Sequence, residues 1–72
     1  MRTADDVRRN PKPGDILRAH GRTREVTGVV LTGAAAGVFV RQEKPARPRN
    51  GFIPLRWYKE WAEKAEVMKV AE

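Results

Sequence analysis

Apolar and polar residues alternate over several short stretches from Gly14 onward, and glycine, proline or asparagine separates one stretch from the next. Short runs of this kind are typical of a small all-β meander and not of strands that alternate with helices. The pattern predicts four strands, which span Asp15 to His20, Thr23 to Leu31, Gly37 to Gln42 and Asn50 to Ile53. His20 and Gly21 fit the tip of a tight hairpin, because glycine readily adopts the positive φ that such turns need.

The alternation also predicts which side of each strand faces the core. Apolar residues two or four positions apart share one face of a strand. The predicted core pairs are Val26 with Val30 on the second strand and Val38 with Val40 on the third. Phe39 and Arg41 then lie on the face opposite the third-strand pair, because successive side chains of a strand point to opposite faces.

The C-terminal part of the chain changes from the strand pattern to a helical one. Leu55 to Ala65 consists largely of good helix formers, and Pro54 suits the first position of a helix. Trp57 and Trp61 share one apolar stripe, so we expect both rings in the core; the alternative is a stacking platform for bases. A last apolar alternation, Val67 to Val70, predicts a short strand that closes the sheet against the first strand.

The N-terminal segment has a different character. Residues 1 to 12 are mainly polar and run into Pro11 and Pro13, where a helix cannot continue. Thr3 and Asp6 have the spacing to cap one short helical turn. We expect residues 1 to 12 to form a flexible, loosely attached arm before a single domain that spans residues 13 to 72.

Together these elements predict a mainly β fold with one short helix. Four strands, an amphipathic helix and a last short strand match an SH3-like small antiparallel β-barrel, in which curled strands remove most free edges. An open α+β sheet with the helix on one face is an alternative. An OB-like barrel is another, although that fold usually needs a longer chain.

Two segments carry a family resemblance. PKPGDILRAHGRTREVTGVV resembles the first hairpin of KOW-type and other SH3-like barrels, and it covers about a third of the chain, roughly residues 13 to 31. Read together with LRWYKEWAEKAEV, it resembles small phage or prophage proteins whose function is generally unassigned. The resemblance implies the SH3-like fold. A free-standing chain of 72 residues departs from the longer ribosomal and transcription-factor chains that contain KOW motifs, so no functional residue is carried over.

Composition narrows the possible functions. The chain has 72 residues, no cysteine and one histidine, which argues for one small domain without disulfides or a structural metal. Cysteine and serine, the two commonest nucleophiles, are both absent and four threonines remain, so we expect a protein that is not an enzyme and has no cofactor. The first residues lack the apolar core of a signal peptide, which leads us to expect a cytoplasmic location.

The distribution of charge is the strongest functional signal. Fifteen lysines and arginines against nine acids give a net charge of +6, and residues 18 to 56 hold eight cations against two acids. Ten of the fifteen cations are arginines, whose planar guanidinium pairs with phosphate through two hydrogen bonds. Phe39 and Phe52 could stack on bases from the face opposite the core. The predicted binding residues are Arg22, Arg24, Phe39, Arg41, Lys44, Arg47 and Arg49.

The leading interpretation is therefore a small basic module that binds DNA or RNA mainly through the phosphate backbone. A phage-type accessory protein that uses the same basic face against an acidic protein is the alternative, and a virion or assembly component is a third. We expect neither a membrane nor a small-molecule substrate as a partner. The charge could equally serve to keep a small domain in solution.

Overall fold

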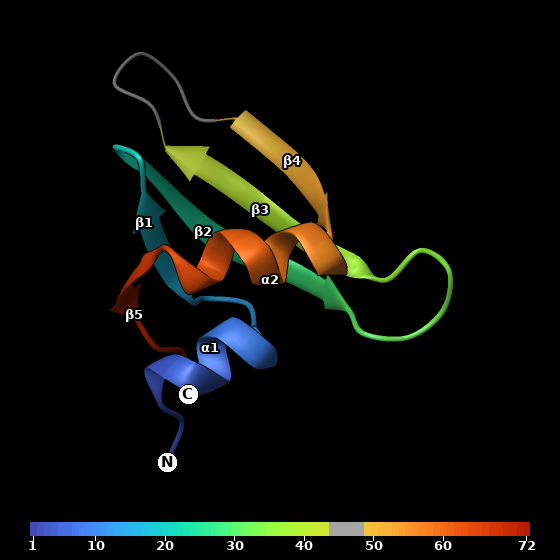
Figure 1. Ribbon diagram of the computed structural model, residues 1–72, viewed down its shortest axis with the longest axis horizontal. Helices are drawn as coiled ribbons and strands as arrows, with labels where there is room; N and C mark the ends of the chain where they lie inside the picture. The colour runs from blue at the N-terminus through green and yellow to red at the C-terminus, as the bar shows by residue number, and fades with distance from the viewer. Residues whose placement is uncertain (44–48) are drawn as a thin grey trace.

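The computed structural model describes residues 1–43 and 49–72, and within them five antiparallel strands form one open sheet accompanied by two short helices (Figure 1). The strand order is β4-β3-β2-β1-β5, so β4 and β5 are the two edges. The mainly β prediction is confirmed. The elements are α1 (Ala4–Arg9), β1 (Ile16–Ala19), β2 (Arg22–Val30), β3 (Gly37–Glu43), β4 (Arg49–Pro54), α2 (Leu55–Glu63) and β5 (Glu66–Lys69).

The structure confirms the predicted first hairpin and the predicted last strand. His20 and Gly21 have positive φ values of 53° and 74°, as a two-residue hairpin tip between β1 and β2 requires. At the other end of the chain, β5 runs antiparallel to β1 and places Val67 opposite Leu17. The last strand therefore returns beside the first.

The pairing of β2 with β3 contains an irregularity that changes which valines face the core. Its register shifts between Val26 and Gly28, as in a β-bulge. Beyond this point Val29 packs against the core, whereas Val30 is 39% exposed. The prediction that Val26 and Val30 share the core face is wrong, because one extra residue reverses the alternation.

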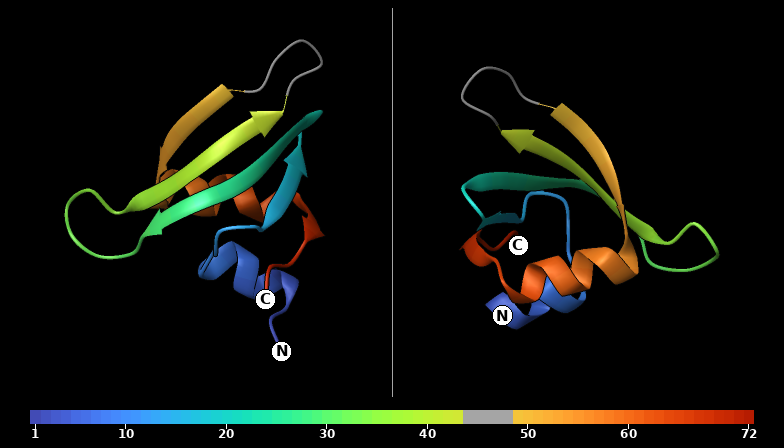
Figure 2. Two further views of the ribbon diagram at one scale, coloured as in Figure 1. Left: turned by 180° about the vertical axis from the view of Figure 1, so that it is seen from behind. Right: turned by 45° about the horizontal axis from the view of Figure 1, so that its top comes forward.

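One face of the sheet is covered by α2, and the other carries no helix (Figure 2). We call the face that α2 covers the inner face and the opposite one the outer face. α1 lies beside α2, close to both chain ends (Figure 1). The core is formed between the inner face and the helices by Val7, Leu17, Ala19, Val26, Val38, Val40, Tyr58, Ala62 and Ala65. No helix in the described part of the chain is long and apolar enough to span a membrane.

The N-terminal segment packs on the domain, in contrast to the expected loose arm. Thr3 and Asp6 do cap α1, since each side chain accepts a hydrogen bond from the backbone N–H of the other. Val7 is fully buried, and its carbonyl accepts a hydrogen bond of 2.8 Å from the Tyr58 hydroxyl. The contacts of Val7 join distant parts of the chain, so the residue pattern of the six-residue α1 could not predict them.

The buried aromatic residue of α2 is Tyr58 and not Trp57. Tyr58 has no exposed surface, Trp61 is partly buried, and Trp57 is 60% exposed, so the prediction that both tryptophans belong to the core is wrong for Trp57. Neighbouring residues of a helix lie about 100° apart around its axis, and Tyr58 with Ala62 takes the side that faces the sheet. Pro54 is the N-cap of the helix, whereas the sequence predicted it as the first helical residue.

Candidate functional site

Four of the predicted binding residues, Arg22, Arg24, Arg41 and Arg49, lie towards one end of the sheet, whereas Phe39 lies farther along β3, opposite Gly28. At this end β1 passes into β2, β3 ends at Glu43 and β4 begins at Arg49 (Figure 1). We call it the basic end. Arg24 lies opposite Gln42 in the β2–β3 register, and Arg41 lies opposite Asn50 in the β3–β4 register. Lys44 and Arg47 lie outside the described residues, and for Arg49 the structure describes only its position in the strand.

The strands divide the predicted residues between the two faces. Arg22 and Arg24 alternate with outward residues and therefore share the inner face with Val26 and Gln42. Phe39 and Arg41 lie on the outer face, as predicted from the alternation, and both are exposed. The structure thus brings Arg22 and Arg24 together but separates them from Phe39 and Arg41 by the thickness of the sheet.

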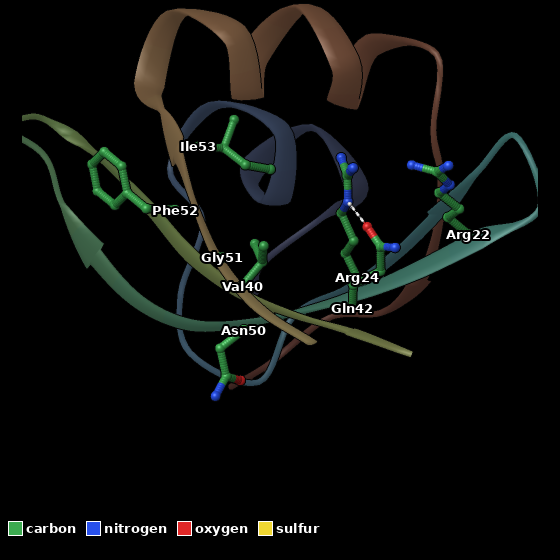
Figure 3. A pocket seen from close by; sticks show the side chains of 8 residues that line it. All are labelled: Arg22, Arg24, Val40, Gln42, Asn50, Gly51, Phe52 and Ile53. Atoms are coloured by element: carbon green, nitrogen blue, oxygen red, sulfur yellow. Dashed lines mark hydrogen bonds between the residues drawn. The ribbon is translucent and has the colours of Figure 1, made fainter. Parts of the chain in front are cut away.

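Arg22 and Arg24 line a cavity of about 280 Å³ between the inner face and the edge strand β4 (Figure 3). Figure 3 shows Arg24, Gln42 and Val40 rising from the sheet towards α2, whereas Asn50 points away from it. The described residues that line it are Arg22, Arg24, Val40, Gln42, Asn50, Gly51, Phe52 and Ile53. These described lining residues include two cations and no acidic residue.

Arg24 is held in place by neutral groups. Its Nε donates a hydrogen bond of 3.2 Å to Oε1 of Gln42, and its guanidinium carbon lies 4.6 Å from the ring centre of Trp61. Burial lowers the pKa of Arg24, and the neighbouring charge of Arg22 lowers it further. An arginine nevertheless stays protonated in proteins. Two positive charges therefore lie close together, with no carboxylate of the described residues within ion-pair distance of either.

Such an arrangement favours the binding of an anion. Partial burial makes charge interactions stronger than in water, and like charges close together destabilise each other. An anion in the cavity would relieve both the repulsion and the lost hydration. The planar guanidinium groups are suited to phosphate or carboxylate oxygens.

The outer face carries an aromatic pair. The ring centres of Phe39 and Phe52 are 4.9 Å apart, and the rings are 47% and 43% exposed. Both rings lie against glycines: a Cβ on Gly28 would come within 3.5 Å of Phe39, and one on Gly37 would collide with the ring of Phe52. Rings over strand glycines stabilise a sheet, so this pair has a structural role in addition to its capacity for stacking.

Two supporting residues of the cavity were missed by the sequence analysis. Gln42 orients Arg24 by a hydrogen bond, and Trp61 lies against the same guanidinium. The signal for Gln42 was present, since it follows the core pair Val38 and Val40 at the same two-residue spacing. Trp61 comes from α2, and no local pattern indicates which strand residue a helix side chain will contact.

At the opposite end of β1 lies a buried carboxylate whose charge is paired within the chain. Asp15 is fully buried and accepts two hydrogen bonds from the guanidinium of Arg2, at 2.6 and 2.8 Å. The backbone N–H groups of Lys12 and Ala71 donate to the same carboxylate. Burial alone would raise the pKa of Asp15, but the bonds from Arg2 and the two N–H groups outweigh burial and lower it. We call this cluster the closed end.

Two further observations complete the description of the site. In the part of the chain that the structure describes, no three histidine, cysteine or acidic side chains gather as metal ligands would. No protein-family model, curated protein or solved structure matches this chain.

Proposed function

We propose that this chain is a non-enzymatic module that binds DNA or RNA through its basic end. The observation that carries the proposal is the pair Arg22 and Arg24 in a cavity whose described lining contains no acidic residue. A phosphate of the nucleic-acid backbone has the charge and the oxygens that two guanidinium groups can hold. Contacts of this kind do not read the bases, so we expect binding with little sequence preference.

The aromatic pair adds a place for bases in this proposal. Phe52 forms part of the cavity lining and also contacts Phe39 on the outer face. A strand with one phosphate near Arg24 would pass over the edge at Gly51, which has no side chain, and bring a base towards the two rings. Stacking on exposed rings contributes roughly 1–3 kcal/mol per base and tolerates any sequence.

We also propose that the fold is related to SH3-like barrels. The order of elements supports this relation, since four meandering strands, a helix and a last strand that returns beside the first agree with the expected sequence of elements. The antiparallel pairing of β5 with β1 supports it further. In this view the module is a partly open barrel with its gap beside β4.

The test is a salt titration of binding to fluorescently labelled single-stranded and duplex DNA and single-stranded RNA. We expect binding at low salt, and an affinity at least tenfold weaker for the double variant Arg22→Gln/Arg24→Gln. Its log–log salt slope should fall by about one to two units, since each contacted phosphate contributes roughly 0.7–0.9. The matched control is Arg56→Gln/Lys59→Gln, which removes the same charge from exposed positions on α2. Equal weakening of both variants, or no binding at low salt, would contradict the proposal.

A further inference from the structure

The edge strand β4 has a side that no other described strand covers. Among the described strands it pairs with β3 alone, and the strand order ends there. The backbone N–H and C=O groups on the outer side of an edge strand can pair with another chain. Asn50, Gly51 and Phe52 are exposed, so this edge is accessible to such a chain. Pro54 limits the pairing at the other end of the strand, because proline has no N–H to donate.

The same stretch of β4 forms one wall of the arginine cavity. Asn50, Gly51, Phe52 and Ile53 line it from the strand, and Arg22 and Arg24 line it from the inner face. A polypeptide added along β4 would point every second side chain to the inner face, at a spacing of about 6.6 Å. Arg22 and Arg24 are themselves two residues apart on β2, so their spacing along the strand is the same. β3 and β4 lie between β2 and the added strand, so the long side chains of the arginines and of the added strand would meet in the cavity.

We propose that β4 accepts an extended acidic segment of a partner protein as an added strand. Backbone hydrogen bonds to β4 supply part of the affinity, and carboxylates at alternate positions of the segment pair with Arg24 and Arg22. This inference goes beyond nucleic-acid binding, because only a polypeptide can extend a β-sheet. It develops the alternative of an acidic protein partner. The two ligands compete, since both use Arg24.

Charge decides in favour of an acidic partner over other occupants. The part of the cavity lining that the structure describes holds two cations and no acid, so carboxylates complement its charge. A second copy of this chain, paired edge to edge, would bring two such cavities and two net charges of +6 together. The chain's own C-terminal residues are held elsewhere, because the N–H of Ala71 donates to Asp15 at the closed end.

The geometry of Arg24 suits a carboxylate as a ligand. Its Nε is used by Gln42, which leaves the terminal nitrogens at the end of a guanidinium held against Trp61. A side chain that is already oriented loses little conformational freedom on binding. Arg22 is exposed and can adjust to the second carboxylate.

The probe is an acetylated and amidated nonapeptide that alternates glutamate with threonine. We expect calorimetry at low salt to detect binding, and hydrogen–deuterium exchange to show protection of β4 amides by the peptide. Arg24→Gln should weaken binding at least tenfold and Arg22→Gln about threefold to tenfold. Arg56→Gln, an exposed arginine on α2, should change it less than twofold. A peptide with lysine in place of glutamate should not bind.

Methylated peptides separate strand addition from simple charge attraction. Two versions of the acidic peptide carry N-methyl groups on alternate amide nitrogens, one on the odd positions and one on the even positions. Both keep every carboxylate, but only one of them loses the N–H groups that face β4. We expect one version to lose binding at least tenfold and the other to bind nearly as well as the parent peptide.

Several results would overturn the inference. One is equal binding of both methylated versions with the parent peptide, since charge alone would then explain the affinity. A second is no binding of the acidic peptide while labelled oligonucleotides bind, which would leave the nucleic-acid proposal intact. A third is a dimer of the free protein in light scattering that Arg24→Gln strengthens, because a second copy would then occupy the edge.

Discussion

Arg2 and Arg24 are both partly buried arginines, but they lie in opposite electrostatic surroundings. Arg2 donates two hydrogen bonds to the buried carboxylate of Asp15, and these bonds raise the pKa of Arg2. Arg24 is bound to the neutral amide of Gln42, and burial together with the charge of Arg22 lowers its pKa. At the closed end the chain supplies its own anion. At the basic end no described residue supplies one, and we propose that a ligand does.

This difference separates an arginine that the chain itself neutralises from one that we propose binds a ligand, and total charge cannot make that distinction. The closed end ties the N-terminal segment to the start of β1 and to the C-terminal residues, because Arg2 also donates to the carbonyl of Ala71 at 2.6 Å. Removing one member of a buried ion pair leaves the other charge uncompensated. At the basic end, removing one cation relieves repulsion.

The largest expected effect is therefore on stability, and it differs between the two arginines. Arg2→Met should lower the free energy of unfolding by about 3 kcal/mol, since it leaves the carboxylate of Asp15 buried without its cation. Arg24→Met should change it by less than about 1 kcal/mol, because the lost contacts with Gln42 and Trp61 are offset by the relief of repulsion. Urea unfolding at pH 7 measures both. Equal losses would remove the distinction between the two ends.

Lowering the pH should remove the stabilisation at the closed end and not that at the basic end. The pKa of Asp15 lies below its ordinary value of 3.8, so its stabilisation is present above pH 3.8 and is lost as pH falls through the lowered pKa. Wild type should be more stable than Asp15→Asn at neutral pH, and the two stabilities should converge below pH 3.8. Thermal melts between pH 2 and pH 7 provide the measurement. The difference between wild type and Arg24→Gln should show no such convergence.

A smaller effect is expected at Tyr58, where α1 joins the core. Tyr58→Phe removes the hydroxyl that donates to the carbonyl of Val7, at a cost of about 1 kcal/mol. The matched control is Trp57→Phe, which changes an exposed ring of the same helix and should cost less than about 0.5 kcal/mol. If the two melting temperatures fall equally, the N-terminal helix contributes little to the core.

Much of the sheet could be predicted from the sequence because strand patterns are local. The hairpin tip at His20 and Gly21 depends on neighbouring residues, and so does the strand pattern of the last segment, whereas the pairing of that strand with β1 joins distant parts of the chain. The bulge beyond Val26 could not be predicted in this way, since its register is decided by pairing with β3. The docking of α1 also depends on contacts across the whole chain, such as Arg2 with Asp15.

The candidate site, like the fold, could be predicted only in part from the sequence. A run of cations indicated Arg22 and Arg24, and strict alternation from Val26 could have placed both on the inner face. The cavity itself depends on β4 and α2, which meet the two arginines only in the folded chain. Phe39 was placed correctly on the outer face, but its contact with Phe52 required the β3–β4 register.

The central claim is that the basic end binds because Arg22 and Arg24 have no carboxylate partner among the described residues, and Gln42→Glu tests it most directly. This change supplies a carboxylate to Arg24 at the position of the present hydrogen bond. The account predicts a gain of up to about 1 kcal/mol in stability and a loss of at least tenfold in affinity for a labelled oligonucleotide. Asn50 also borders the cavity, but its side chain points away from α2 and Arg24. Asn50→Asp therefore adds the same charge farther from Arg24 and should lower the affinity much less. Unchanged affinity of the Gln42→Glu variant, or an equal loss in both variants, would contradict the account.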